Sequence, residues 1–207
     1  MNDVYMAFTA AFFIPLLFHS WRVALLGLAV QGMLLAMVPA SHVHEWSNQI
    51  AVECGLLFIL RGVVAPWLLY RYAITHQGEL PFALIGKNIY EWAIAAVLLV
   101  GAFLLGDRLA PHDAHEALQV GTAAGCILIG MFVLSRQNAR FGQAVGLLTI
   151  ESGMALVELL SPHAMPVPVS IGVNVVYVTL LITMGLYLRS SSAATAGSEA
   201  PVIKGEA

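Results

Sequence analysis

The sequence predicts an all-α fold: a polytopic transmembrane helical bundle of about seven spans. Hydrophobic residues make up 59% of the 207 positions and charged residues only 10%, whereas an ordinary soluble domain is about 25% charged. The charged residues lie in short clusters between apolar runs. These runs are long enough to cross about 30 Å of hydrocarbon as helices that rise about 1.5 Å per residue. We therefore expect most of this chain to lie in a membrane rather than in water.

Each predicted span ends at a polar or proline-containing connection. In chain order the connections read HSWR, PASHVHEWSN, RYAITHQGELPFALIGK, DRLAPHDAHE, SRQNAR and SPHAMPVP. Prolines and clusters of small polar residues favour loops over helix interiors. We therefore expect the spans at Val4 to His19, Val23 to Val38, Ile50 to Tyr70, Asn88 to Gly106, Leu118 to Leu134, Phe141 to Leu160 and Val167 to Leu188.

The two ends of the chain are predicted from composition. No lysine or arginine precedes the first apolar run, so we expect that run to be a retained span rather than a signal peptide. The last eighteen residues, SSSAATAGSEAPVIKGEA, are small, polar and without pattern. We expect one transmembrane domain over residues 1–189 and a disordered cytoplasmic tail over residues 190–207.

Basic residues are distributed unequally between the two ends of the predicted helices. One end carries Arg22, Arg71, Lys87, Arg136, Arg140, Arg189 and Lys204, and the other end carries only Arg108. Cytoplasmic loops are enriched in lysine and arginine, so the richer end is predicted to be cytoplasmic. An N-terminus outside and a C-terminus in the cytoplasm require an odd number of spans, which agrees with seven.

Five ionisable residues fall inside predicted spans: Glu53, Arg61, Glu91, Glu151 and Glu158. A charge within the bilayer costs at least a few kcal/mol, so it usually faces a partner or a wet cavity. Glu53, Glu91 and Glu158 lie near span ends, where interfacial placement or local pairing is the alternative to a function. Arg61 and Glu151 lie near the middle of their helices. We interpret them as functional candidates, with a buried contact for register or assembly as the alternative.

Glu151 is the strongest candidate for carrying protons. Glu158 follows seven residues later, two turns on nearly the same helical face and about 10 Å along the axis. A proton passing between them through water is a chemically reasonable step. The helix FGQAVGLLTIESGMALVELL also supplies hydroxyl and amide groups, from Gln143, Thr149 and Ser152. Its glycines allow close helix approach, so docking against a neighbouring helix is the alternative interpretation.

Arg61 remains charged at any accessible pH and therefore needs an acidic or carbonyl partner. Glu53 precedes it by eight residues on the same predicted helix, about 12 Å away along the axis, which is too far for direct contact. We therefore expect the partner on another helix. Pro66 in the same span removes a backbone hydrogen bond and predicts a kink.

Several function classes are excluded by the sequence. A net charge of −3 without a basic run argues against nucleic-acid binding. The seven histidines fall in connections or at span edges, whereas membrane cytochromes hold haem between histidines inside facing helices. No Walker loop, dinucleotide fingerprint or complete HExxH motif is present. We expect no catalytic centre, cofactor or metal in this chain.

The stretch SRQNARFGQAVGLLTIESGMALVELL resembles a region of the hydrogenase-4 component E family, in which an Arg-Asn turn precedes a Gln-x-x-Gly-Leu-x-x-x-Glu pattern. The stretches WRVALLGLAVQGMLLA and LLFILRGVVAPWLLYR also resemble that family, with Gln31 in the second span and Arg61 five positions before Pro66. Length, span count and order fit over about residues 4–189. In its C-terminal half the family is similar to the K subunit of respiratory complex I and the C subunit of multi-subunit sodium/proton antiporters.

The resemblance implies a membrane-arm subunit of a complex-I-like respiratory or hydrogenase complex of the formate hydrogenlyase type, in a bacterial cytoplasmic membrane. It implies partners: larger antiporter-like subunits and a hydrogenase-anchoring subunit, with iron–sulfur clusters and a nickel–iron centre carried by partner subunits. Glu151 then matches the buried glutamate of the proton-conducting axis. The last span departs from the pattern, because it offers only Asn174 where relatives have a second acidic residue. An amide does not exchange a proton near neutral pH.

Two other functions remain open from the sequence. One is a purely structural spacer between larger membrane subunits. The other is a transport role, either as a subunit of a cation/proton antiporter or as a small stand-alone transporter. Few polar residues and no inverted repeat argue against the stand-alone transporter. Co-purification separates these cases, because a transporter is isolated alone and a membrane-arm subunit with larger partners.

Overall fold

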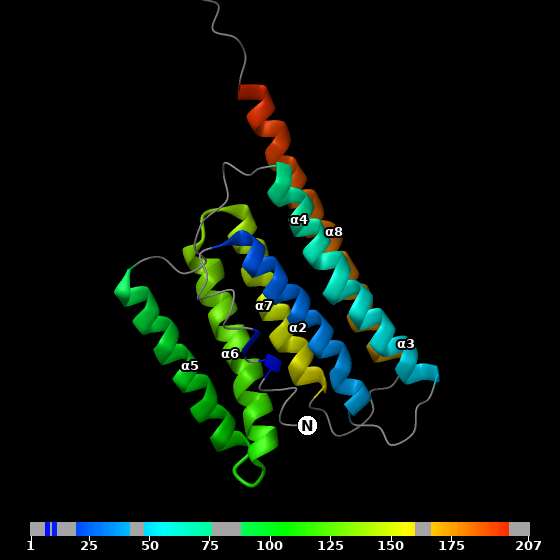
Figure 1. The fold of residues 1–207 in the computed structure, drawn as a ribbon, viewed down its shortest axis with the longest axis vertical. Coiled ribbons are helices and arrows are strands. Elements are labelled where there is room, and N and C mark those ends of the chain that lie inside the picture. The colour runs from blue at the N-terminus through cyan, green and yellow to red at the C-terminus, as the bar shows by residue number, and fades with distance from the viewer. Residues whose placement is uncertain are drawn as a thin grey trace, which may run out of the picture. The chain divides into compact units, whose positions relative to one another are not determined.

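The computed structural model describes residues 7–8, 10–11, 20–41, 48–75, 88–159 and 167–198, and within them it contains helices and no strand. Figure 1 shows these helices as long rods. The helices are α2 (Trp21–Ser41), α3 (Asn48–Leu57), the π-helix η1 (Phe58–Val64), α4 (Ala65–Thr75), α5 (Ile89–Leu109), α6 (Ala114–Arg136), α7 (Arg140–Leu159) and α8 (Val167–Ser198). The predicted all-α class is confirmed.

Four helices in the described part of the chain are long and apolar enough to cross a membrane. They cover Trp21–Pro39, Cys54–Thr75, Ile89–Leu109 and Ala114–Arg136, and they correspond to the second to fifth predicted spans. The sixth and seventh predicted spans are also helical, as α7 and α8. Most of the first predicted span, Val4 to His19, lies outside the described residues. The count of seven spans and the orientation remain predictions.

The chain divides into two compact units, Met1–Pro166 and Val167–Ala207. The second unit contains α8, which continues beyond the predicted span end at Leu188 and reaches Ser198. The predicted disordered tail therefore begins with helical residues, among them alanines that favour helix. Residues 199–207 lie outside the described part.

In the first unit α6 packs along both α5 and α7, and α2 packs against α3, η1, α4 and α7. Asn88 begins α5 by accepting a hydrogen bond from the Tyr90 backbone N–H at 3.2 Å. Asp113 begins α6 by accepting bonds from the N–H groups of His115 and Glu116. Such caps satisfy backbone donors that a helix leaves open at its first turn. The Asp113 cap fixes where α6 begins after the α5–α6 turn.

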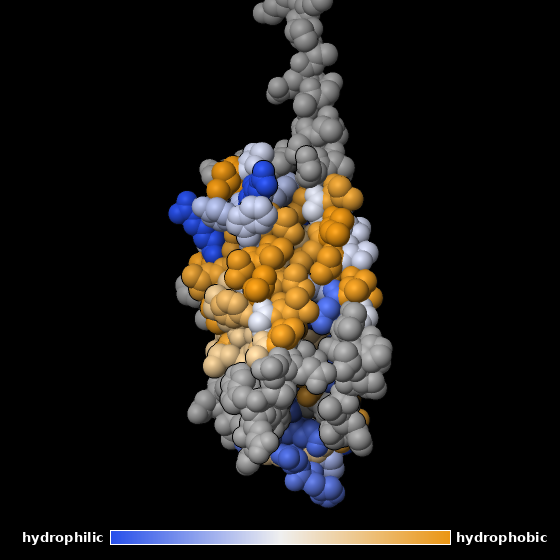
Figure 2. All heavy atoms as spheres, turned by 90° about the vertical axis from the view of Figure 1, so that its right-hand side faces the viewer, coloured by the Kyte–Doolittle hydropathy of each residue, from blue (hydrophilic) through white to orange (hydrophobic). Residues whose placement is uncertain are grey.

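The outer surface of the helices is largely apolar. Figure 2 shows a broad band of apolar side chains across one face, with hydrophilic side chains above and below it. On α5 the exposed residues include Ile89 at 77%, Val97 at 71% and Leu109 at 64%. Soluble monomers rarely expose apolar patches of this extent. A surface of this kind fits contact with lipid chains.

Candidate functional site

The candidate site lies where the helix α3–η1–α4 meets α7. This helix is interrupted by the π-helical segment Phe58–Val64, which carries Arg61. At its end the Ala65 N–H donates to the Leu60 carbonyl, five residues back, and Pro66 follows immediately. Proline cannot donate the next backbone bond, and π-helical turns are frequent at functional sites. The irregular turn thus coincides with the mid-helix arginine.

Helix α2 supports this segment from one side by close backbone contact. A Cβ atom built on Gly32 would lie 2.5 Å from the carbonyl oxygen of Arg61, so only glycine fits there. Across the same crossing, a Cβ on Gly62 would lie 3.3 Å from Met33 Cγ. Small residues let membrane helices approach to backbone contact. The Arg61 backbone is therefore held directly by α2.

Helix α7 is set against α6 by a second close crossing. A Cβ atom on Gly146 would lie 3.0 Å from the Gly130 carbonyl oxygen, and one on Gly153 would lie 2.8 Å from the Ala123 carbonyl oxygen. The sequence prediction of close approach at these two α7 glycines is confirmed. Since Glu151 lies between them on α7, the crossing determines how far along the bundle and in which direction its carboxylate is presented.

Arg61 and Glu151 form a buried bidentate ion pair. Arg61 Nη1 donates to Glu151 Oε2 at 2.7 Å, and Arg61 Nη2 lies 2.5 Å from Oε1. The arginine side chain is 5% exposed and the glutamate side chain 15%. Two parallel N–H···O bonds match the planar guanidinium to the carboxylate and are among the strongest polar contacts in proteins. The structure thus places the partner of Arg61 on another helix, ninety positions along the chain.

Glu158 is the second carboxylate near the pair. It lies two turns after Glu151 on α7, is partly buried, and its negative charge opposes a negative charge on Glu151. The structure brings two of the predicted relay candidates, Arg61 and Glu151, into direct contact. Glu158 lies on the same helix as Glu151, two turns further along.

The polar neighbours on α7 bind backbone rather than one another. Thr149 donates its hydroxyl to the Val145 carbonyl at 2.8 Å, and Ser152 donates to the Leu148 carbonyl at 2.9 Å. These four-residue back-bonds place both hydroxyls in the groove of their own helix. The hydroxyl oxygens retain accepting capacity. These two hydrogen bonds do not connect the Glu151 carboxylate to either hydroxyl group.

Gln31 is a buried polar residue beside the site that the sequence argument left without a role. It is 2% exposed and belongs to the buried stripe of α2, next to Gly32. A buried amide group needs hydrogen-bond partners. Its place in a stripe of apolar residues is the sequence signal that marks it.

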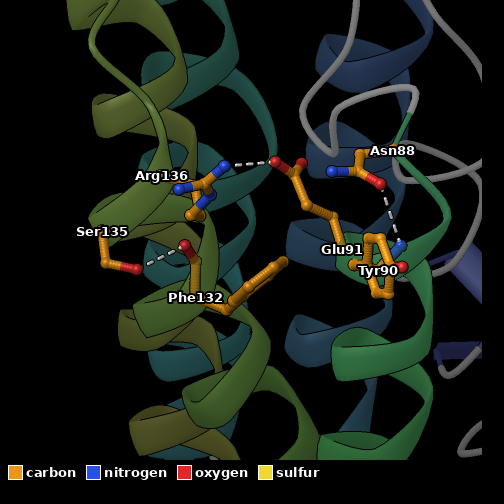
Figure 3. A network of polar contacts seen from close by, with 6 residues as sticks. All are labelled: Asn88, Tyr90, Glu91, Phe132, Ser135 and Arg136. Carbon is orange, nitrogen blue, oxygen red and sulfur yellow. Dashed lines mark hydrogen bonds and ion pairs between the residues drawn. The ribbon is translucent and has the colours of Figure 1, made fainter.

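Glu91 belongs to a different pair, at the ends of two helices. Figure 3 shows its carboxylate directed from the start of α5 toward Arg136 near the end of α6. Arg136 Nη2 donates to Glu91 Oε1; the arginine is 55% exposed and the glutamate 13%. Nearby, Ser135 donates its hydroxyl to the Phe132 carbonyl at 2.8 Å. Of the two interpretations for Glu91, the structure shows local pairing.

The remaining two candidates are not brought to the site by the described contacts. Glu53 lies on α3, and its side chain is outside the described residues. Asn174 lies on α8, in the second unit. In the described part of the chain, no group of three or more His, Cys, Asp or Glu residues is arranged to hold a metal ion.

Comparison with known proteins assigns no family. No family model matches the chain, and no solved structure matches it. The chain is similar to a Mycobacterium tuberculosis protein described as "Uncharacterized protein Rv0085", with 25% identity over 165 residues. This alignment covers 77% of the present chain and 74% of the relative. The function must therefore be argued from the site.

Proposed function

We propose that this chain is a membrane-arm subunit of a complex-I-like respiratory or hydrogenase complex, of the formate hydrogenlyase type, and that it contributes to proton translocation. The observation that carries the proposal is the buried Arg61–Glu151 pair near the middle of two helices. Charged residues at that depth mark ion or proton pathways in membrane proteins. Four apolar helices and the sequence resemblance to hydrogenase-4 component E support the setting.

The pair has the chemistry of a charge-coupled proton carrier. With Glu151 ionised, the Arg61 cation is compensated; when Glu151 takes up a proton, the pair gains one positive charge. Because a buried uncompensated charge is costly, a change of charge in a neighbouring subunit would shift this equilibrium. The π-helical segment carries Arg61, and π-helical turns are frequent at functional sites. Glu158, two turns further along α7, is the proposed acceptor for the proton that Glu151 releases.

The wider assignment follows the same resemblance. Electron transfer takes place in partner subunits that carry the iron–sulfur clusters and the nickel–iron or other redox centre, and this chain binds no cofactor. Its partners are larger antiporter-like membrane subunits and a hydrogenase-anchoring subunit in a bacterial cytoplasmic membrane.

The orientation of the chain in the membrane is tested by a separate experiment. A reporter fused after Arg189 should be cytoplasmic, because seven basic residues mark that side. A reporter found outside would change the span count by one.

A purely structural spacer is the second candidate function, and one observation favours it. The Arg61–Glu151 pair is closed by two direct contacts, and the adjacent hydroxyls of Thr149 and Ser152 bind backbone. Such a pair also serves to fix helix register during assembly. The spacer and the proton carrier differ in one respect: only the carrier needs a titratable group at residue 151.

The decisive experiment replaces the titratable group and keeps the shape. Glu151→Gln retains size and hydrogen-bonding capacity but has no proton to exchange. The assembled variant complex is placed in vesicles, and protons translocated per electron are measured, with uncoupled electron transfer as the reference. Glu91→Gln is the matched control, since Glu91 also pairs with an arginine. We expect the ratio to fall in Glu151→Gln and to stay at the wild-type value in Glu91→Gln. An unchanged ratio in both variants would favour the spacer.

A further inference from the structure

A second cluster of charged and aromatic residues lies at the start of α2 and in the last part of α4. Arg22 is exposed in the first turn of α2, with its guanidinium carbon 5.4 Å from the centre of the Trp21 ring. Arg71 is exposed in the last part of α4, with its guanidinium carbon 5.6 Å from the Trp67 ring centre. Each arginine is thus supported on an aromatic face.

The two halves of this cluster are joined by direct contact. The Trp21 and Tyr70 rings lie 6.2 Å apart between their centres, tilted by 41°, and α2 packs against α4. Because α2 begins where α4 ends, both arginines stand at the same end of these helices. We call this set the arginine–aromatic cluster: Trp21, Arg22, Trp67, Tyr70 and Arg71.

In the described part of the chain, the cluster carries positive charge and no carboxylate pairs with it. The ion pairs among those residues are Arg61–Glu151 and Arg136–Glu91, and neither includes Arg22 or Arg71. The first turn of α2 contains no acidic residue. Its backbone N–H groups and the positive end of its dipole add to the same field. A phosphate group has the negative charge and the hydrogen-bond acceptors that fit this cluster.

The exposed apolar area beside the arginines indicates what kind of molecule carries the phosphate group. Trp67 is 53% exposed, Tyr70 49% and Ile74 48%, and they lie within the last nine residues of the apolar segment Cys54–Thr75. Tryptophan and tyrosine are enriched at the membrane–water boundary, where one part of the ring is apolar and the other wet. A free phosphate ion would leave this apolar area uncovered, whereas a phospholipid supplies glycerol and acyl carbons next to its phosphate.

We propose that the arginine–aromatic cluster is a binding site for the phosphate headgroup of an anionic phospholipid. The two guanidinium groups bind phosphate oxygens, for which their planar donor arrangement is suited. The exposed faces of Trp67 and Tyr70 contact the glycerol region. Basic sites between membrane helices bind anionic headgroups in this way. The site is separate from the Arg61–Glu151 pair and does not depend on its function.

Native mass spectrometry of the full chain tests this site. The purified protein is offered equimolar phosphatidylglycerol and phosphatidylcholine, and the ratio of retained lipids is measured. Each arginine near an anionic lipid contributes about 1 kcal/mol, so the double variant Arg22→Gln/Arg71→Gln should lower the phosphatidylglycerol preference roughly 10- to 30-fold. Arg108→Gln, an exposed arginine at the end of α5, is the matched control and should leave the ratio unchanged.

Two further arms make the result unambiguous. Arg22→Lys/Arg71→Lys keeps the charge but loses the planar donors, so the preference should fall by only about threefold; this variant also serves if the double glutamine variant does not fold. Inorganic phosphate at millimolar concentration should not displace the retained lipid. A wild-type preference in both arginine variants, or release by inorganic phosphate alone, would overturn the proposal of a lipid-headgroup site.

Discussion

The two ion pairs among the described residues have the same chemistry and opposite surroundings. Arg61 and Glu151 meet in the interior, at 5% and 15% exposure, from helices ninety residues apart in sequence. Arg136 and Glu91 meet at helix ends, with the arginine 55% exposed. An exposed pair contributes about 0–1 kcal/mol because water screens it. This difference in exposure shows that burial, and not the pairing itself, makes Arg61–Glu151 the candidate for function.

The largest effect is expected from removing one member of the buried pair. Arg61→Ala leaves Glu151 as a buried carboxylate without its bidentate partner, which costs about 3–5 kcal/mol. We expect loss of assembly or coupling, together with a lower unfolding midpoint in detergent. Arg136→Ala at the exposed pair should cost about 1 kcal/mol or less. Wild-type assembly and activity in Arg61→Ala would show that the buried ion pair contributes neither to assembly nor to function.

A smaller loss is expected from disturbing the backbone that supports Arg61. In Gly32→Ala the added methyl meets the Arg61 carbonyl at 2.5 Å, so α2 and η1 must separate, at about 1–3 kcal/mol. Gly55→Ala is the control, because no atom lies within 4 Å of its added Cβ. That change should be neutral or stabilising by up to about 1 kcal/mol through helix propensity. Equal denaturant midpoints for the two variants would contradict the close crossing.

The smallest effect is expected at the exposed pair. Glu91→Gln removes a partly screened attraction, so the free energy of unfolding should fall by about 0–1 kcal/mol. Raising the salt concentration should reduce the difference between this variant and the wild type, because salt screens exposed charges. The measurement is the denaturant midpoint at two ionic strengths. A loss as large as that of Arg61→Ala would remove the distinction between the two pairs.

The sequence predicts the helices well because apolar runs and their polar interruptions are local signals. It also predicts that Arg61 needs a partner on another helix, since its charge is permanent. It does not identify Glu151 as that partner, because the pairing depends on how α2 crosses η1 at Gly32 and how α7 crosses α6 at Gly146. Such crossings are properties of packing between distant segments, with no periodic signature in the chain.

The exposed pair was predictable in a way that the buried pair was not. Glu91 and Arg136 lie at comparable distances before and after the short turn between α5 and α6, so an antiparallel hairpin brings them together. The π-helical segment had only Pro66 as a signal, from which a kink was predicted. Its extent, Phe58–Val64, coincides with the contacts that Arg61 makes with α2 and α7.

The proposed proton translocation requires Glu151 to change its protonation state during turnover. Infrared difference spectroscopy of the assembled complex measures this directly, because a protonated carboxyl group has a carbonyl band that a carboxylate lacks. We predict a carboxyl band that appears or disappears on turnover in the wild type and in Glu91→Gln, and that is absent from the difference spectrum of Glu151→Gln. A difference spectrum that keeps this band in Glu151→Gln, or lacks it in the wild type, would contradict the claim.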